Sequence, residues 1–329
     1  GYDDYWTYSG TRRYASYTNL PPGDYTFRVK GSNNDGVWNE EGASLKIKIL
    51  PAPWETVWAY MLYFATTGFG IFGYVKRQRR LQAHAMEEQH REEELEEARQ
   101  FQLDMLPKTT PDMLNLDIAA TIQTASEVGG DYYDFFPQSN GESLYVVVGD
   151  ATGHGMTAGM MVSITKAGLY GIPPSIAPND ITKRLNRVIK NIDLGWNRMA
   201  INVARFWEDR VEFTSAAMPP VYHYHTETGD VDEILIVGLP LGSIKGETFS
   251  LVDFEFKQGD SLVFISDGLP EAANHTEHML GYQAVQDCVK ANGHQNANDQ
   301  KQALLDLGSA WLGDLRNQDD ITIVVVKKK

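Results

Sequence analysis

The sequence predicts an α+β fold in which a layered β-sandwich is flanked by helices. Short apolar runs typical of strands recur from residue 116 to the C-terminus, and helical patterns lie among them without strict alternation. Grouped strands with helices outside a regular alternation indicate an α+β domain and argue against a doubly wound parallel sheet. Upstream of this domain, the pattern predicts a β module, an uncharged helix and a charged helix.

The elements of the C-terminal domain, residues 112–329, are predicted from the spacing of apolar residues. Nine segments have the composition of strands: 116–123, 132–136, 144–148, 201–206, 211–214, 221–224, 249–256, 262–265 and 321–326. Four segments have the spacing of helices: 156–170, 180–192, 282–291 and 299–315. In the last helix, a repeating set of apolar residues predicts a stripe that faces the core: Leu304, Leu307, Trp311 and Leu315.

Composition limits the classes of function. The net charge of −15 argues against a nucleic-acid-binding surface, which needs basic patches to displace counterions. The only cysteine, Cys288, excludes an internal disulfide and a Cys-based zinc finger, so we expect it to fill space in the core. The chain begins with Gly1 inside a strand-and-turn pattern, without an initiator Met, which predicts a fragment of a longer protein.

Residues 1–52 are predicted to form a β module. Apolar and polar side chains alternate over 25–30 and again over 45–49, the period of half-buried strands. The sequences YTNLPPGDYTF at 17–27 and NNDGVW at 33–38 resemble the Y_Y_Y domain. That resemblance implies an immunoglobulin-like module of the kind found in the periplasmic sensor halves of bacterial hybrid regulators.

Residues 54–75 are predicted to form one transmembrane helix. Twenty residues, 56–75, carry no charge, and such a helix would cover the hydrocarbon core of a bilayer, about 30 Å. Aromatic residues lie near both ends, and four basic residues follow immediately: Lys76, Arg77, Arg79 and Arg80. The positive-inside rule then predicts a single-pass protein of the bacterial inner membrane whose C-terminal domain is cytoplasmic. The alternative is a buried core helix.

Residues 76–106 are predicted to form a linker helix about 45 Å long, because they contain neither Gly nor Pro and are rich in helix formers. A stripe in its last turns favours a coiled coil, and hence a homodimer through this helix, over a monomer: Leu95, Ala98, Phe101 and Met105. The middle of the helix is rich in Glu, which leaves a solvated single helix as the alternative.

Aspartates stand at the ends of several apolar runs of the C-terminal domain. Asp131 follows two glycines, Asp150 and Asp267 follow strand-like runs, and the pair Asp319 and Asp320 precedes another. Carboxylates that strand ends deliver to one edge of a sheet form an acidic pocket lined by oxygen. Such a pocket suits hard divalent cations, so the pattern predicts a two-metal hydrolytic centre.

Five motifs occur in the order and approximate spacing of the PPM (type 2C) metal-dependent protein phosphatases: GGDYYDF at 129–135, GDATGHG at 149–155, GLPLG at 238–242, SDGLPEA at 266–272 and DDIT at 319–322. They look most like the bacterial SpoIIE/RsbU-like branch. The resemblance covers residues 94–326 and implies the PPM phosphatase fold. It also implies two divalent metal ions, Mn²⁺ or Mg²⁺, as cofactors.

The resemblance implies a role for each site residue. Asp131 would bind one metal, Asp150 would bridge both, and the backbone carbonyl of Ala151 would join the first. Asp267 and Asp319 would hold the second. Two such ions activate a water for in-line attack on phosphorus.

Two further residues are candidates for catalysis. Asp320 is predicted to orient Asp319 or the attacking water. His154 is a candidate general acid, although it lies four residues after Asp150, whereas in many eukaryotic relatives the histidine lies two residues after. A structural role for His154 is the alternative.

Together these features predict a membrane-anchored signalling protein whose cytoplasmic output is a metal-dependent serine/threonine phosphatase. The resemblance implies a phosphoprotein substrate, commonly an anti-sigma-factor antagonist. Helices at 156–194 follow Asp150 directly and could shift it between metal-competent and incompetent positions. One alternative is a catalytically silent relay with the same fold. Another is a GGDEF-like nucleotidyl cyclase, suggested by GGDYY at 129–133, although the following Glu-Phe of that motif is absent.

Overall fold

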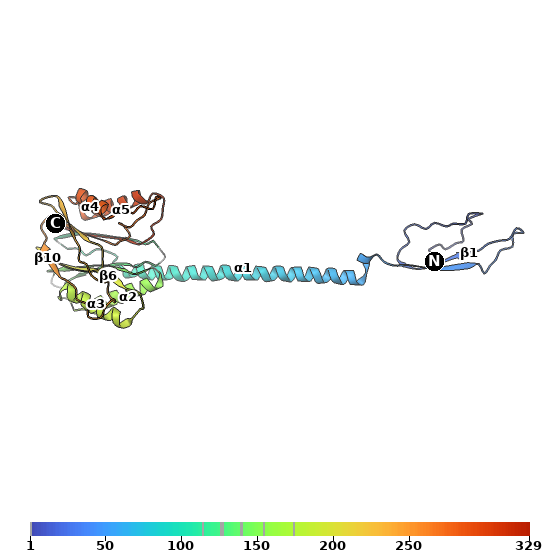
Figure 1. Cartoon of the computed structure of the whole chain (residues 1–329), viewed down its shortest axis with the longest axis horizontal. Helices are drawn as coiled ribbons and strands as arrows, with labels where there is room; N and C mark the ends of the chain where they lie inside the picture. The colour runs from blue at the N-terminus through green and yellow to red at the C-terminus, as the bar shows by residue number, and fades with distance from the viewer. Residues whose placement is uncertain (1, 114, 126–127, 139–140, 154, 174) are drawn as a thin grey trace. The chain divides into compact units, whose positions relative to one another are not determined.

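The computed structural model describes residues 2–113, 115–125, 128–138, 141–153, 155–173 and 175–329. The chain folds into two compact units, residues 1–87 and 88–329. Figure 1 colours both units along the chain, from the N-terminal β module to the C-terminal domain.

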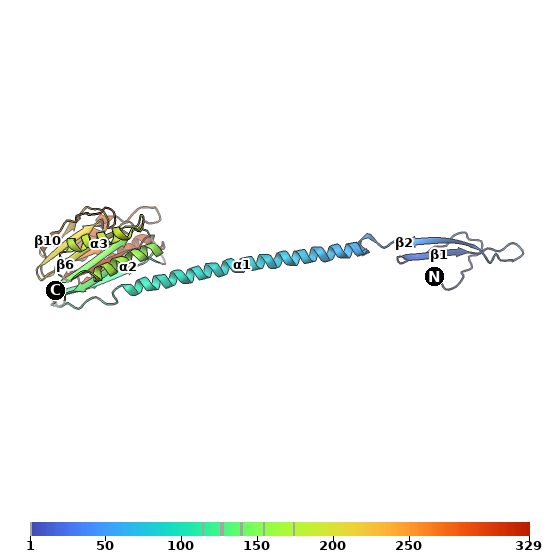
Figure 2. The ribbon, with the colours of Figure 1, turned by 90° about the horizontal axis from the view of Figure 1, so that it is seen from below.

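The N-terminal unit is built on one antiparallel hairpin. Strand β1, Gly23–Val29, pairs with β2, Ala43–Ile49, and the two lie side by side in Figure 2. Aromatic rings pack edge to face beside it, with Tyr17 6.3 Å from both Tyr2 and Phe27 between ring centroids. None of residues 2–87 is buried, because two strands alone cannot enclose a core.

A single helix, α1, runs from Val57 to Met105 after the short 3₁₀ turn η1, Pro53–Glu55. It therefore includes most of the predicted transmembrane helix and nearly all of the predicted linker helix. Thr56 caps its start, with the hydroxyl oxygen accepting a hydrogen bond from the Ala59 amide at 3.3 Å.

The prediction of a membrane span at 54–75 is wrong. Among the described residues, no helix is long and apolar enough to cross a bilayer. The physical reason is that absence of charge is not the same as apolarity: Trp, Tyr, Thr and Gly make up much of this segment and lower its hydropathy. The single-pass placement in the inner membrane is therefore wrong as well, and the bilayer as a partner has no support.

The C-terminal unit contains two five-stranded antiparallel sheets. The first has the order β10-β7-β6-β5-β4, with these bounds: Val252–Glu255, Arg210–Ala216, Met199–Phe206, Leu144–Ala151 and Asp131–Pro137. The second has the order β3-β12-β11-β8-β9, with these bounds: Leu116–Gln123, Ile321–Lys328, Ser261–Ile265, Val221–His225 and Asp230–Ile234.

Two helices cover the outer face of each sheet. Helices α2, Met156–Tyr170, and α3, Pro178–Ile192, pack on the first sheet. Helices α4, Tyr282–Asn292, and α5, Ala297–Leu312, pack on the second. Figure 1 shows these pairs on opposite sides of the sheets. The predicted α+β fold, with a layered sandwich between helices, is confirmed.

The main core lies between the two sheets. Phe264 of β11 is fully buried and its ring centroid lies 6.5 Å from that of Phe206 and 6.4 Å from that of Phe213, which belong to the other sheet. A second cluster lies under α4 and α5 and includes Leu304 of the predicted stripe, with Cys288 at its margin. These contacts fix the strand ends on which the aspartates stand.

Most ends of the predicted elements shift by up to three residues, and two differences have a clear physical reason. Strand β9 was not predicted, because its sequence, DVDEI, has three carboxylates and no apolar run. It forms an edge strand of the second sheet. Helix α5 lies two to three residues earlier than predicted. Asn296 caps its start by accepting a hydrogen bond from the Asp299 amide at 2.9 Å, and Gly313 ends it with φ +64°. Leu315 therefore lies beyond the helix.

The contact between the sheets predicts a large cost for Phe264→Ala. Removing a fully buried ring should lower the free energy of unfolding of the C-terminal unit by about 3–5 kcal/mol. The measurement is equilibrium urea unfolding followed by circular dichroism. Val237→Ala is the control, because Val237 is 88% exposed and should change stability by less than about 0.5 kcal/mol. Equal effects of the two substitutions would contradict this view of the core.

Candidate metal centre

Gly129 and Gly130 precede β4 at a point where the surrounding atoms leave no room for a side chain. A Cβ on Gly130 would lie 2.5 Å from the Ala151 carbonyl oxygen, 2.9 Å from Asp150 Oδ1 and 3.1 Å from the Gly153 carbonyl oxygen. A Cβ on Gly129 would lie 2.0 Å from Asp320 Oδ2. Glycine is thus required sterically, and three oxygens from the end of β5 converge at this point.

Asp131 and Asp150 face each other across adjacent strands. The register of β4 and β5 makes them direct partners, so both carboxylates stand at the same edge of the first sheet. Asp131 is 1% exposed, and its Oδ2 has no hydrogen-bond partner among the described residues. Burial, and then the charge of Asp150, raise the pKa of Asp131 well above its usual range. A buried carboxylate oxygen without a partner is costly unless a cation or a proton satisfies it.

The second sheet brings further carboxylates to this edge. Burial raises the pKa of Asp150 to about 8, and the charges of Asp267, Asp319 and Asp320 add to the effect in that order. Burial, and then the charge of Asp319, also raise the pKa of Asp267 to about 6. Asp267 follows β11 and Asp319 precedes β12, so the two sheets contribute to one electrostatic field.

Asp319 and Asp320 have different environments despite being neighbours. Asp319 is exposed, and its Oδ1 accepts a hydrogen bond from the Asp320 amide at 2.8 Å. Asp320 is buried, and its two oxygens accept hydrogen bonds from the amides of Ala125 and Gly130, each at 2.8 Å. A Cβ on Gly268 would lie 2.1 Å from the Asp320 carbonyl oxygen, so the segment after β11 and the segment before β12 are in close contact.

An open cavity of about 210 Å³ lies at this edge. Its lining contains four of the predicted site residues and three others: Asp150, Ala151, Asp319, Asp320, Ala125, Gly153 and Gln318. Asp131 is buried and Asp267 half-buried, and neither lines the cavity. His154, the candidate general acid, lies outside the described residues.

The donor set fits hard divalent cations. Every side chain that the motifs bring to this edge offers carboxylate oxygen, the Ala151 carbonyl adds another oxygen, and one buried oxygen of Asp131 has no partner among the described residues. No three of these carboxylates lie within 4.8 Å of one another by their ligand atoms in the described part of the chain.

A contact from α1 to the loop that precedes Asp131, here called the metal loop, was not predicted. Gln102 is 4% exposed, its Nε2 donates to the Gly129 carbonyl oxygen at 2.8 Å, and its Oε1 accepts from the Gly129 amide at 2.9 Å. Both backbone polar groups of Gly129 are therefore held by one side chain of the helix. No local pattern distinguishes Gln102 from its neighbours, because its partner lies 27 residues away.

A second contact holds the last turn of α1. Lys166 of α2 donates to the Met105 carbonyl oxygen at 2.6 Å and pairs with Asp134 Oδ2 at 2.7 Å. Tyr132 also donates to Asp134 Oδ2 at 2.7 Å. Asp134, which the sequence suggested only as a polar residue at a strand end, is thus a buried ion-pair partner that joins β4 to α2.

Two family models match parts of this chain. The family model for stage II sporulation protein E (SpoIIE) matches residues 140–329, and the Y_Y_Y domain model matches residues 1–50. Phosphoserine phosphatase RsbU of Bacillus subtilis is 28% identical over 241 residues, which cover 72% of this chain and 70% of RsbU.

Solved structures share the fold of the C-terminal unit. The SiaA-PP2C domain of Pseudomonas aeruginosa has a TM-score of 0.64 at 19% identity and covers 74% of this chain and 98% of that domain. The PP2C phosphatase domain of SpoIIE from Bacillus subtilis, solved with a fragment of its regulatory domain, has a TM-score of 0.55 at 19% identity, over 66% of this chain and 64% of that one. The chain belongs to the SpoIIE family, with a PP2C-like phosphatase domain and a Y_Y_Y domain at its N-terminal end.

Proposed function

We propose that this chain is a signalling protein whose C-terminal unit hydrolyses phosphoserine or phosphothreonine in a phosphoprotein with the help of Mn²⁺ or Mg²⁺. The observation that carries the proposal is the pair Asp131 and Asp150 at facing positions of β4 and β5, with one buried oxygen of Asp131 unsatisfied among the described residues. The similarity to a phosphoserine phosphatase, RsbU, supports the substrate class. An anti-sigma-factor antagonist remains the predicted class of phosphoprotein.

In this proposal, the residues divide the work by position. Asp131 and the Ala151 carbonyl would hold the first ion, Asp150 would bridge both, and Asp267 and Asp319 would hold the second. When bound, such ions supply a nucleophilic water at neutral pH and neutralise charge on the phosphoryl group. PP2C-family phosphatases use Mn²⁺ or Mg²⁺ for this purpose. The exposed Asp319 and the open cavity leave room for a phosphorylated side chain.

Asp320 has a positioning role in this proposal. Both of its carboxylate oxygens accept backbone hydrogen bonds from the loop that carries Asp131. The same contacts fix Gly130 against the Ala151 carbonyl. This control of the loop shape adds to the predicted role of Asp320 in orienting Asp319 or the attacking water, which stays a prediction.

Regulation is proposed to act through the end of α1. Gln102 holds Gly129, two residues before Asp131, and Lys166 connects the last turn of α1 to α2. Helix α2 begins at Met156, soon after Asp150, which agrees with the predicted coupling of residues 156–194 to this carboxylate. A homodimer through α1 stays a prediction; Phe101 of its stripe is 65% exposed.

Hydrolysis of p-nitrophenyl phosphate tests the enzymatic proposal against a catalytically silent relay. The full chain should hydrolyse this compound in a Mn²⁺-dependent reaction, and Asp150→Asn should lower the rate more than about 100-fold, because it removes the bridging charge. Asp253→Asn on exposed β10 is the control and should retain activity. A folded wild-type chain without activity would favour the relay, and activity retained in Asp150→Asn would contradict the assigned centre.

The raised pKa values of Asp150 and Asp267 predict how stability depends on pH. The folded, metal-free chain keeps protons on these groups up to about pH 8 and about pH 6, whereas the unfolded chain releases them near 3.8. The folded state therefore binds more protons over this interval, and stability should fall as pH rises from about 4 to about 8. Differential scanning calorimetry of the metal-free chain should show this fall.

Mn²⁺ should reverse this loss of stability at high pH, because a cation can replace the protons on Asp150 and Asp267. The rise in melting temperature on adding Mn²⁺ should be larger at pH 8 than at pH 5, and Asp150→Asn should reduce it. A rise independent of pH, or unchanged in Asp150→Asn, would place the Mn²⁺ effect outside this group of carboxylates.

Gln102→Ala should weaken the centre without touching an aspartate. Two hydrogen bonds to buried backbone groups are lost, at a cost of about 1–3 kcal/mol, and the metal loop loses its support. We expect a higher Mn²⁺ concentration for half-maximal activity. Gln100→Ala is the matched control, since Gln100 is exposed two residues earlier on the same helix. The same Mn²⁺ requirement in both variants would argue against coupling through Gln102.

A further inference from the structure

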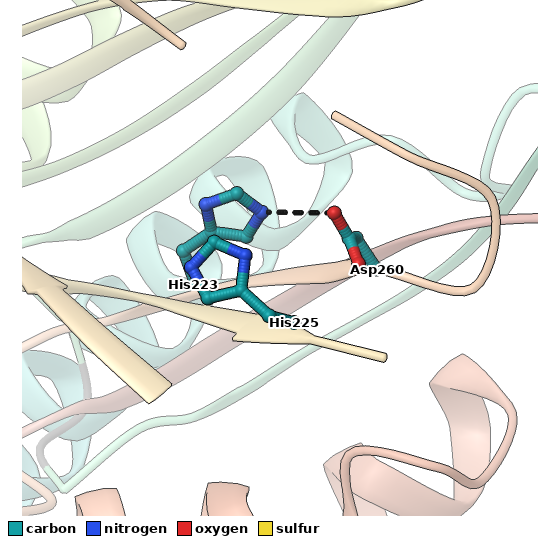
Figure 3. A group of neighbouring side chains, drawn as sticks. All are labelled: His223, His225 and Asp260. Carbon is teal, nitrogen blue, oxygen red and sulfur yellow. Dashed lines mark ion pairs between the residues drawn. The ribbon is translucent and has the colours of Figure 1, made fainter. Parts of the chain in front are cut away.

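A second group of potential ligands lies at the other end of β11. His223 and His225 come from the end of β8, and Asp260 stands directly before β11, whereas Asp267 follows it. The five residues of β11 span about 17 Å. Figure 3 shows the two imidazole rings next to each other, with the Asp260 carboxylate facing His223.

His223 presents a buried nitrogen without a hydrogen bond. Its side chain is 3% exposed, and its Nε2 lies 3.4 Å from Asp260 Oδ2 without a hydrogen-bond partner among the described residues. The ring packs against Phe254 and Phe256, with centroids at 5.1 and 5.8 Å. A buried polar atom of this kind points to a missing partner.

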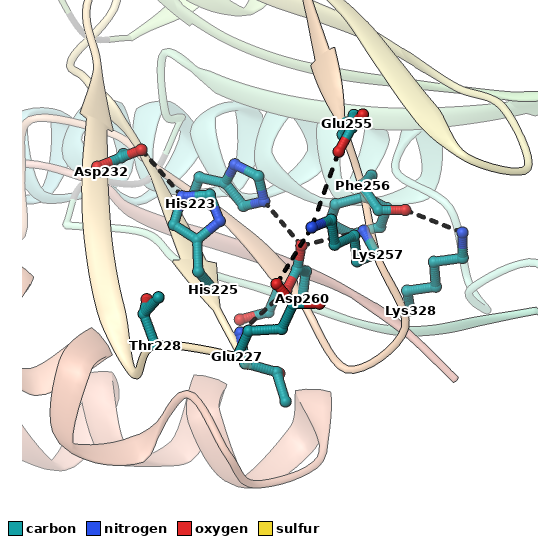
Figure 4. Close-up of polar contacts among 12 residues, drawn as sticks. His223, His225, Glu227, Thr228, Asp232, Glu255, Phe256, Lys257, Asp260 and Lys328 are labelled. Carbon is teal, nitrogen blue, oxygen red and sulfur yellow. Dashed lines mark hydrogen bonds and ion pairs between the residues drawn. The ribbon is translucent and has the colours of Figure 1, made fainter.

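His225 stands on the same face of the strand, because side chains two residues apart point the same way. Its ring centroid lies 4.0 Å from that of His223. Its Nε2 lies 2.9 Å from Asp232 Oδ2, and in Figure 4 Asp232 and Asp260 lie on opposite sides of this ring. A proton shared with a carboxylate at Nε2 leaves the lone pair on Nδ1 and makes it a better metal ligand.

Asp260 is held in a fixed orientation. It is 2% exposed, its Oδ1 accepts from the Thr226 amide at 2.9 Å, and its Oδ2 accepts from the Lys257 amide at 3.0 Å. A carboxylate oxygen with one hydrogen bond still has a lone pair for a cation. One side chain therefore ties the segment after β8 to the turn before β11, beside both histidines.

We propose that His223, His225 and Asp260 bind a divalent transition-metal ion, and we commit to Zn²⁺. One ligand atom from each residue lies within 4.8 Å of the other two. Tetrahedral ligands of Zn²⁺, at about 2.0–2.2 Å from the ion, lie about 3.4 Å apart, so a small inward movement completes the site. The half-buried ring of His225 leaves a fourth position open to water.

The surrounding charges favour a cation. Asp232 pairs with His225 at 2.9 Å, and Glu227 and Glu255 both pair with Lys257, as Figure 4 shows. Lys257 pairs with Glu227 at 3.1 Å, and Lys328 donates to the Phe256 carbonyl oxygen at 2.9 Å, so both ammonium groups already have partners. The ligand type separates this site from the acidic centre, because imidazole suits Zn²⁺ and carboxylate oxygen suits Mg²⁺ and Mn²⁺.

A bound ion would stabilise one end of the second sheet. Both histidines belong to β8, and Asp260 directly precedes β11, which pairs with β8. The ion would therefore join the end of β8 to the start of β11, at the end of β11 that is remote from the acidic centre. Binding of the ion should raise the stability of the chain and leave the rate of hydrolysis unchanged. This inference is therefore independent of the proposed phosphatase activity.

The test is titration of Zn²⁺ into the full, metal-free chain by calorimetry, in an Asp150→Asn background that weakens the acidic centre. We expect one Zn²⁺ per chain, and a rise in melting temperature on binding. His225→Gln should weaken this binding more than about 10-fold, whereas His294→Gln, at an exposed histidine of the loop after α4, should not. His225 is only half-buried, so this variant is expected to fold.

Co²⁺ provides a second readout that reports the ligands themselves. Tetrahedral Co²⁺ with nitrogen ligands absorbs visible light strongly, whereas an octahedral oxygen site absorbs weakly. The strong bands should appear in the wild-type chain and be lost in His225→Gln and Asp260→Asn. Zn²⁺ affinity and Co²⁺ bands unchanged in a folded His225→Gln chain, or no Zn²⁺ binding in the Asp150→Asn background, would overturn the proposal.

Discussion

The repulsion among carboxylates gathered at one edge of the sandwich is the constraint on which the remaining structure depends. Asp131 is buried directly opposite Asp150, which is half-buried, and the charges of Asp267 and Asp319 reach the same place. Burial of like charges is unfavourable, so the fold has to hold these loops by other contacts. Glycines at 129 and 130 allow the close approach, and Asp320 uses its own charge to bind backbone amides of the opposing loop.

The strand register determines where each carboxylate of the acidic centre lies. Asp131 faces Asp150 only because β4 and β5 pair in one register, and a slip by one residue would turn Asp131 to the other face of the sheet. The register is fixed by the apolar residues of β5 and β6, which are buried on both faces. In the second sheet, the pairing of β11 with β12 brings the segments after Ile265 and before Ile321 together. The core therefore sets the geometry of the acidic centre.

Sequence reasoning worked where the controlling interaction is local. Apolar periodicity predicted α2 and β3 with their observed ends, and the motifs drew attention to the aspartates. It failed for residues 54–75, where the absence of charge was taken as apolarity although Tyr, Trp and Thr carry polar atoms. It did not find the contacts that Asp320 and Gln102 make with the loop before Asp131, because their partners lie 195 and 27 residues away.

The loop that carries Asp131 is held from two sides, and we propose that this arrangement couples the loop to the end of α1. Asp320 fixes the loop from the second sheet, and Gln102 fixes it from the helix. The two hydrogen bonds from Gln102 to Gly129 are worth about 1 kcal/mol each, or about 2 kcal/mol together. Displacement of the helix end would then shift the population of the ordered loop roughly 30-fold. A change of this size is a useful switch, and it leaves the sandwich, with its far larger buried core, intact.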